Sequence, residues 1–143
     1  MPPAIQAVLE TTLYVSDVAR AVAFYRDVLG LRPLDEFSER GAAFQAGPSV
    51  LLLFRADLCL SMDELPRHGA IGPGHVAFRV HPDEVPRWRQ YLNERGVEIV
   101  KEKMFGENSP SLYLHDPDGN VIEIAVATIW PLEQRWSRAE PFG

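Results

Sequence analysis

The stretch of sequence that decides the fold lies in the middle of the chain and reads Ile71-Gly72-Pro73-Gly74-His75-Val76-Ala77-Phe78-Arg79-Val80. After the Gly-Pro-Gly turn, apolar residues recur at positions 76, 78 and 80, and His75, Ala77 and Arg79 alternate with them. Alternation with a period of two is typical of a strand that packs one face on a helix and shows the other to a cavity or to water. His75 therefore begins a strand and belongs to its open face.

The chain after this strand continues as a helix and three further strands. Asp83 is the predicted N-cap of the helix, Pro86 is tolerated at the third helical position, and Gly96 ends the helix. The last two strands are joined by Asp116-Pro117-Asp118-Gly119, in which Pro and Gly suit the positions of a tight turn. The three strands are predicted at residues 97–104, 111–115 and 120–126.

The first half of the chain shows the same order of elements. A half-buried strand is predicted at residues 7–15, and a helix then begins after Ser16-Asp17 and ends at Gly30. Residues 55–74 have little periodicity and contain several prolines and glycines, so they are predicted to be a connecting loop. The three strands before this loop are predicted at residues 31–37, 42–45 and 50–54.

Equivalent positions of the two halves recur at nearly constant spacing. Glu10 and His75 each open the first strand of their half, 65 positions apart, and the helix-ending Gly30 and Gly96 are 66 apart. We infer an internal duplication and an α+β fold of two tandem βαβββ modules, whose sheets join into a cupped mixed sheet with a pocket on its concave face. The predicted single domain spans residues 1–143, with modules at 7–56 and 73–127, a linker at 57–72 and an extension at 128–143.

Composition limits the classes of partner. The chain has 143 residues, a formal net charge of -6 and no cluster of Lys and Arg, which argues against binding to nucleic acid or to an anionic membrane. With no apolar segment long enough to span a membrane, a cytoplasmic location is expected. The single cysteine, Cys59, excludes an intrachain disulfide, and we interpret it as structural in preference to a thiol nucleophile.

Strand parity gathers side chains with metal-ligand chemistry on the concave face. Ile122 and Ile124 face the helix, so Glu123 faces the concave side, and the same rule turns Glu10 inward. Glu10, His75 and Glu123 would hold Fe, Mn, Ni or Zn and leave positions open for water and substrate. For His75 the alternative is a strand-start histidine hydrogen-bonded to the turn.

Five further residues are candidates for the same pocket. Arg79 either neutralises Glu123 or anchors an anionic substrate. Tyr113 supplies an acid/base phenol or forms the cavity wall, and His115 contacts substrate or caps the neighbouring turn. His68 either folds over the cleft and contacts substrate or is an exposed loop residue. Leu52 occupies the fourth equivalent position, where it cannot ligate a metal and would contact substrate instead.

Two motifs carry a family resemblance: Phe-Tyr-x-x-x-Leu-Gly at residues 24–30 and Asp-Pro-Asp-Gly-Asn-x-x-Glu at residues 116–123. Together they resemble the vicinal oxygen chelate superfamily, which includes glyoxalase I, bleomycin and fosfomycin resistance proteins and extradiol dioxygenases. The resemblance spans roughly residues 7–127 and implies paired βαβββ modules, a divalent metal bound by His75 and Glu123, and a homodimer. Glu10 stands where many members have histidine.

Two functions follow from these expectations. The first is a metal-dependent enzyme of the glyoxalase or dioxygenase type, in which Lewis-acid stabilisation acts on a small substrate with vicinal oxygens and Glu10 doubles as a base. The second is a metal-free binding protein, similar to bleomycin resistance proteins, that holds a flat, cationic or aromatic ligand against an acidic wall. The tail that contains Trp130 and Trp136 is expected to cover the pocket or a second subunit.

Overall fold

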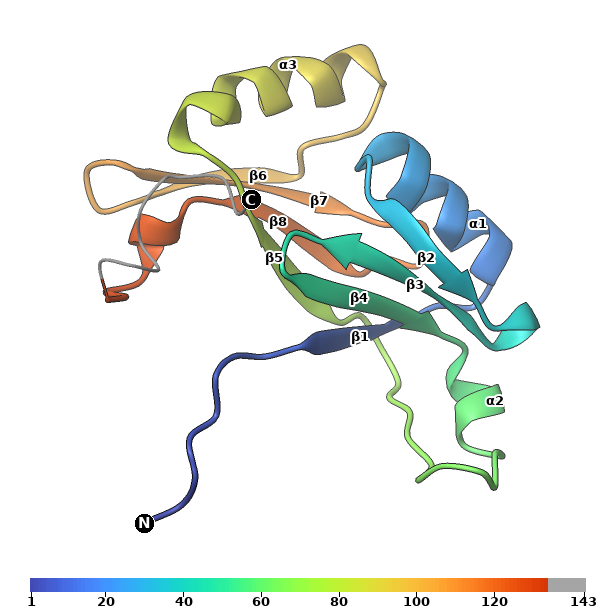
Figure 1. The fold of residues 1–143 in the computed structure, drawn as a ribbon. Helices are drawn as coiled ribbons and strands as arrows, with labels where there is room; N and C mark the ends of the chain where they lie inside the picture. Colours follow the sequence, from blue (N-terminus) through green and yellow to red (C-terminus); the bar gives the residue numbers. More distant parts are fainter. Residues whose placement is uncertain (134–143) are drawn as a thin grey trace. The chain divides into compact units, whose positions relative to one another are not determined.

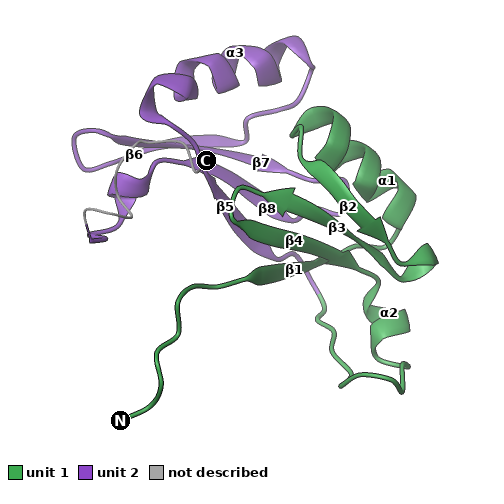
Figure 2. Ribbon diagram, viewed as in Figure 1, with its two compact units in different colours: residues 1–71 green, residues 72–143 purple. Residues whose placement is uncertain are grey.

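The structure, a computed structural model, describes residues 1–133 and divides into two compact units (Figure 2). Unit 1 is Met1–Ile71 and unit 2 is Gly72–Gly143. Each unit contains one of the two predicted modules, and the predicted linker falls almost wholly within unit 1. No helix within residues 1–133 has both the length and the apolar character needed to cross a membrane.

Unit 1 is a four-stranded mixed sheet with the order β1-β4-β3-β2. Strand β1 runs parallel to β4, and the other pairs are antiparallel. Helix α1 connects β1 to β2 and packs on β3 and β4 (Figure 1). The elements are β1 (Glu10–Tyr14), α1 (Val18–Ala23), a π-helical turn (Phe24–Val28), β2 (Arg32–Glu36), a 3-10 turn (Ser38–Arg40), β3 (Gly41–Ala46), β4 (Ser49–Phe54) and α2 (Ala56–Cys59).

Unit 2 repeats this topology with the order β5-β8-β7-β6. Strand β5 runs parallel to β8, and helix α3 connects β5 to β6 and packs on β7 (Figure 1). Both units are therefore βαβββ modules, which confirms the predicted α+β class. The elements are β5 (His75–Arg79), a 3-10 turn (Pro82–Glu84), α3 (Val85–Glu94), β6 (Lys101–Phe105), β7 (Ser109–His115), β8 (Val121–Ala125) and a 3-10 turn (Ala127–Ile129).

The duplication extends to individual backbone hydrogen bonds. In unit 1 the N–H of Val50 donates to the carbonyl of Leu9 at 2.9 Å, and in unit 2 the N–H of Val121 donates to the carbonyl of Gly74 at 2.9 Å. Each donor lies 71 positions from its counterpart and each acceptor 65, and the second offset equals the spacing between Glu10 and His75. The parallel strand pairs of the two units thus have the same register.

The register also fixes which side chains are equivalent. Glu10 pairs with Val50 as His75 pairs with Val121. Two positions further along, Leu52 lies opposite Thr12, and Glu123 lies at the same place in unit 2. The prediction that Leu52 is the counterpart of Glu123 is therefore confirmed by strand pairing.

Each helix covers one face of its own sheet with apolar side chains. Complete burial of such a side chain stabilises the fold by about 1.5–3 kcal/mol. The alternation predicted for β5 is weaker than expected, because Val76 and Phe78 are only half-buried. Most of the packing comes from the residues that are buried. They include Leu13, Val22, Tyr25, Phe44, Leu51 and Leu53 in unit 1 and Val85, Leu92, Leu112, Leu114, Ile122 and Ile124 in unit 2.

The prediction that Asp83 caps the second helix is wrong. The chain first forms the 3-10 turn Pro82–Glu84, and the Asp83 N–H donates to Nδ1 of His81 at 3.2 Å, so the side-chain cap lies two residues earlier. Residues 55–74 are not wholly a loop either, because α2 adds one helical turn there. In unit 1, by contrast, Asp17 caps α1 as predicted and accepts from the Arg20 N–H at 3.0 Å.

Gly41 at the start of β3 allows close approach of two strands. Its φ of 175° is ordinary extended backbone, but a Cβ there would overlap the carbonyl oxygen of Leu53 and the ring of Phe54. We expect Gly41→Ala to lower the free energy of unfolding by about 1–3 kcal/mol, because the strands must move apart. Urea denaturation measures the change, and Gln45→Ala, at an exposed site of β3, is the control. Equal stability of the two variants would contradict this account of Gly41.

Candidate functional site

His75 and Glu123 form the centre of the polar face of the unit 2 sheet. His75 opens β5, Glu123 lies in the middle of the adjacent strand β8, and the parallel register sets them two positions apart on the same face. His75 Nε2 lies 3.3 Å from Glu123 Oε1. The imidazole is half exposed (51%), whereas the carboxylate is buried (7%). The predicted proximity of these two residues is therefore present within one unit.

Both side chains are held from behind by hydrogen bonds. His75 Nδ1 lies 3.0 Å from the carbonyl oxygen of Val121, so this nitrogen carries the hydrogen and donates it. That tautomer leaves a lone pair on Nε2. On the other side, the hydroxyl of Ser111 donates to Glu123 Oε2 at 2.6 Å, which leaves Oε1 facing the imidazole. The partner of His75 is thus the β8 backbone, and not the turn of the alternative interpretation.

This arrangement fits a divalent transition metal. In the tautomer assigned above, Nε2 and Oε1 are both acceptors, so their close approach requires a shared cation, either a proton or a metal ion. Zinc binds His nitrogen and carboxylate oxygen at about 2.0–2.2 Å, which separates two such ligands by roughly 2.8–3.6 Å at octahedral to tetrahedral angles. The observed 3.3 Å lies within that range.

Tyr113 is the third side chain of this face. It pairs with Glu123 across β7 and β8, and its ring stacks on His75 with 6.4 Å between centroids and 24° between planes. Burial raises the pKa of the Tyr113 phenol, and the negative charge of Glu123 and a hydrogen bond to it raise that pKa further. A hydrogen bond with Ser111 has the opposite effect. The phenol is therefore protonated at neutral pH and is a hydrogen-bond donor.

The Asp116–Asn120 turn fixes the start of β5. Asp116 Oδ1 accepts from the N–H groups of Asp118 and Asn120, both at 2.9 Å, and its Oδ2 accepts from the Asn120 amide at 2.8 Å. The Asn120 Oδ1 in turn accepts from the N–H of Gly74 at 2.7 Å. Because Gly74 precedes His75, the turn ties the backbone that positions the imidazole to the β7–β8 connection. Sequence reasoning identified the motif but did not assign this role to Asn120.

Of the other predicted residues of unit 2, Arg79 and His115 lie on the same sheet face as His75. Arg79 is half-buried at the end of β5. His115 is exposed on β7 and pairs with Val121 of β8. His75 pairs with the same residue from the other side of β8. Register thus confirms their common face, and their predicted contact with substrate stays a prediction.

Three predicted residues, Glu10, Leu52 and His68, belong to unit 1. Glu10 is exposed at the start of β1, and Leu52 is half-buried on β4. Within residues 1–133, no three His, Cys, Asp or Glu side chains are grouped so that they could hold a metal ion. The participation of Glu10 as a ligand stays a prediction.

His68 is half-buried, unlike the exposed loop residue of the alternative interpretation. Its Nδ1 lies 2.5 Å from the hydroxyl of Tyr14 on β1, and its ring meets that of Phe54 edge-on at 5.3 Å. Burial is the main cause that raises the pKa of the Tyr14 phenol, and the electrostatic effect of nearby Cys59 adds to it. The segment after α2 is therefore fastened to the unit 1 sheet through His68.

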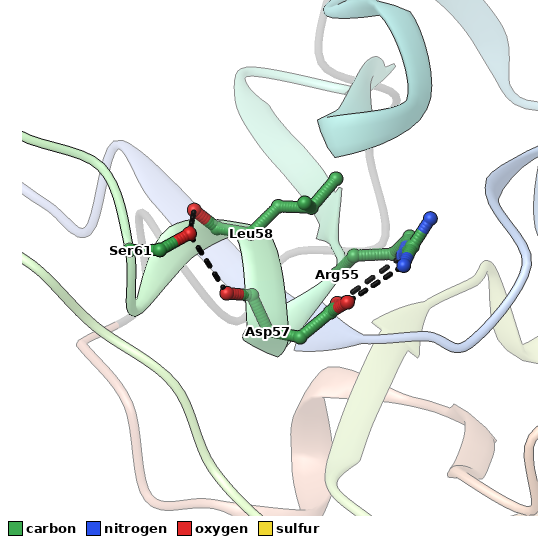
Figure 3. A network of polar contacts seen from close by, with 4 residues as sticks. All are labelled: Arg55, Asp57, Leu58 and Ser61. Atoms are coloured by element: carbon green, nitrogen blue, oxygen red, sulfur yellow. Dashed lines mark hydrogen bonds and ion pairs between the residues drawn. The ribbon is translucent and has the colours of Figure 1, made fainter.

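A polar network surrounds α2, immediately before that segment (Figure 3). Arg55 Nη2 lies 2.6 Å from Asp57 Oδ2, and the hydroxyl of Ser61 donates to the carbonyls of Asp57 and Leu58 at 3.1 and 3.2 Å. The hydrogen bond from Arg55 lowers the pKa of Asp57. These contacts close the single turn of α2, which holds Cys59 in a fully buried position.

Cys59 should be protected from thiol reagents in the folded protein. Burial raises the pKa of the Cys59 thiol, so the folded protein keeps this proton at pH values where the unfolded chain loses it. The free energy of unfolding therefore falls as the pH rises above the ordinary thiol pKa. We expect Ellman's reagent at pH 8 to react at least about tenfold more slowly with the folded protein than with the protein in denaturant. The signal reports Cys59 alone, because the chain has one cysteine. Equally fast labelling in both states would restore the thiol-nucleophile interpretation.

The tail is described only in part. The hydroxyls of Thr128 and Ser109 lie 2.7 Å apart, and Trp130 is exposed. Trp136 lies outside the described residues, so the predicted packing of the tail over the pocket or a second subunit stays a prediction.

Comparisons with known proteins agree with this architecture. Residues 7–124 match the family model described as "Glyoxalase/Bleomycin resistance protein/Dioxygenase superfamily". The metallothiol transferase FosB of Staphylococcus saprophyticus is 30% identical over 127 residues, which cover 87% of this chain and 80% of the relative. The glutathione transferase FosA of Serratia marcescens is 30% identical, with 87% and 84% covered. A crystal structure of lactoylglutathione lyase from Agrobacterium tumefaciens, 34% identical, has a TM-score of 0.85 and matches 92% of this chain and all of that chain. The chain belongs to the Glyoxalase/Bleomycin resistance protein/Dioxygenase superfamily, as its motifs predict.

Proposed function

We propose that this protein is a divalent-metal-dependent enzyme that acts on a small substrate with vicinal oxygens. The observation that carries the proposal is that His75 Nε2 and Glu123 Oε1 face each other. The hydrogen bonds of His75 Nδ1 with Val121 and of Glu123 Oε2 with Ser111 leave these two facing atoms as acceptors. Relatives named as a metallothiol transferase and a lactoylglutathione lyase support it. A homodimer, a cytoplasmic location and dioxygenase chemistry stay predictions.

The residues of the chain have distinct tasks in this proposal. His75 and Glu123 would hold the metal, with Glu10 as the predicted third ligand, which would double as a base. A bound divalent ion supplies Lewis-acid polarisation of the substrate oxygens. Tyr113 stays protonated because its pKa is raised, and its phenol would transfer its hydrogen bond from Glu123 to a substrate oxygen when substrate binds.

The remaining candidates would contact the substrate away from the metal. Arg79 offers a cation for an anionic group and His115 an exposed imidazole, both on the sheet face that carries Glu123. His68 and Leu52 of unit 1 would add an imidazole and an apolar surface.

Titration of metal-free protein with Mn²⁺, Ni²⁺ and Zn²⁺ tests the metal site. We expect one ion per chain in the wild type, and a weaker constant in Glu10→Gln if Glu10 is a ligand. Glu107→Gln, at an exposed position of the β6–β7 turn, is the matched control. Unchanged affinity in Glu10→Gln would remove Glu10 from the site and leave the His75–Glu123 pair.

The enzymatic part has its own assay, in which the loaded protein is offered the hemithioacetal of methylglyoxal and glutathione, and separately a thiol with an electrophilic acceptor. Metal-dependent turnover in either assay that is lost in His75→Ala supports the proposal. A protein that binds no metal and converts neither substrate would instead favour the metal-free binding function.

A further inference from the structure

We infer that Ser111 fixes Glu123 as a one-oxygen ligand and thereby makes the site select zinc-like ions over calcium. The inference rests on the proposed metal site and adds a positioning residue to it. Nothing in the sequence motifs singles out this serine, which lies between two apolar residues of β7.

The contact between the two residues is short, buried and charge-assisted. Ser111 is fully buried, and its hydroxyl donates to Glu123 Oε2 at 2.6 Å. An O–H···O⁻ distance of about 2.5–2.7 Å belongs to the strongest class of hydrogen bond in proteins. Because little water reaches this point, turning Oε2 towards a metal would break its hydrogen bond with Ser111. The Ser111 hydroxyl would then have no water to accept its hydrogen in place of Glu123.

The position of the hydroxyl is fixed by the sheet. Ser111 pairs with Lys103 of β6, and the residue two positions later, Tyr113, pairs with Glu123 of β8. Ser111 is therefore held diagonally across from Glu123 by ladders on both sides of β7. The phenol of Tyr113 hydrogen-bonds to the same carboxylate. The carboxylate is thus oriented with Oε1, and not both oxygens, towards His75 Nε2.

A carboxylate oriented in this way favours some ions over others. Zinc takes one carboxylate oxygen and His nitrogen at short distances with about four ligands. Calcium takes 6–8 oxygen ligands, often both oxygens of a carboxylate, at about 2.3–2.6 Å. Removing the Ser111 hydroxyl releases Oε2, so the site should lose affinity for zinc and lose part of its discrimination against calcium.

The test compares metal binding by metal-free wild type, Ser111→Ala and Ser111→Thr in competition titrations with Zn²⁺ and Ca²⁺. We expect Ser111→Ala to bind Zn²⁺ about 10–100-fold more weakly and to have a smaller Zn²⁺/Ca²⁺ affinity ratio. Ser111→Thr keeps the hydroxyl and should recover both quantities. The absorption spectrum of bound Co²⁺ gives a readout independent of turnover and should change in Ser111→Ala only.

The matched control is Ser109→Ala. Ser109 is a buried serine of the same strand and face, but its hydroxyl is bonded to Thr128 and not to Glu123. Its loss should leave zinc affinity unchanged. Should Ser111→Ala fail to fold, Ser111→Cys, with a weak donor of similar size, carries the same comparison.

Two outcomes overturn the inference in distinguishable ways. Zinc affinity and Co²⁺ spectrum equal to wild type in Ser111→Ala would show that Ser111 does not position the ligand, while the metal site itself stands. A wild type that binds no zinc would remove the proposed function, and the inference with it.

Discussion

Replacing Glu123 with Gln is expected to weaken zinc binding by more than about 100-fold, the upper end of what a hydrogen-bonding partner behind a ligand contributes. The amide keeps the size of the side chain and can still accept from Ser111, but it removes the negative charge opposite His75 Nε2. Competition with a coloured zinc chelator measures the constant.

The metal-free form of this variant should be at least as stable as the wild type, because a buried carboxylate is costly without a cation. Glu102→Gln is the matched control, since Glu102 is an exposed carboxylate of β6 that pairs with Arg89. Wild-type zinc affinity in Glu123→Gln would exclude this carboxylate as a ligand.

Replacing Asn120 with Ala is expected to lower the free energy of unfolding by about 2–4 kcal/mol. The change removes the hydrogen bond from the Asn120 amide to Oδ2 of buried Asp116 and takes the side-chain acceptor from the Gly74 N–H, and each such loss costs about 1–3 kcal/mol. Urea denaturation of metal-free protein gives the value.

The same variant should also bind zinc more weakly, because the backbone that positions His75 is no longer tied to the turn. Asn93→Ala, at an exposed position of α3, should stay within about 0.5 kcal/mol of wild type. If Asn120→Ala were as stable as this control, the proposed role of the Asn120 side chain would be wrong.

Sequence periodicity was sufficient to predict the fold and the central pair of the site. Side chains of a strand alternate strictly, so the apolar positions of β5 and β8 left His75 and Glu123 on one face. The near-constant offset between halves predicted the common topology, and strand pairing confirms it for Leu52 and Glu123.

The parts that were not predicted depend on the register between strands and on the rotamers of individual side chains. Ser111 lies on the predicted face, but its bond to Glu123 requires the diagonal placement of β7 against β8. The tie from Asn120 to Gly74 joins residues 46 positions apart. Asp83 was assigned as a cap because its residue type is favoured there, whereas Pro82 starts a 3-10 turn first and moves the cap to His81.

The two modules share a backbone but carry different chemistry at equivalent positions. In unit 2, position 123 is a buried carboxylate that meets His75. In unit 1 the equivalent position is Leu52, which cannot ligate a metal, and Tyr14 and His68 make a polar contact on that sheet face. Duplication therefore preserved the fold in both units, while an opposed pair of ligand atoms is found in unit 2.

The most direct test of the central claim is the metal content of protein purified without chelator, compared between the wild type and His75→Ala. We predict about one transition-metal ion per wild-type chain. We predict almost none in the variant, which should nevertheless stay folded because His75 is half exposed. Equal metal content in the two proteins, or none in the wild type even after dialysis against Mn²⁺, Ni²⁺ or Zn²⁺, would contradict a metal site at His75 and Glu123.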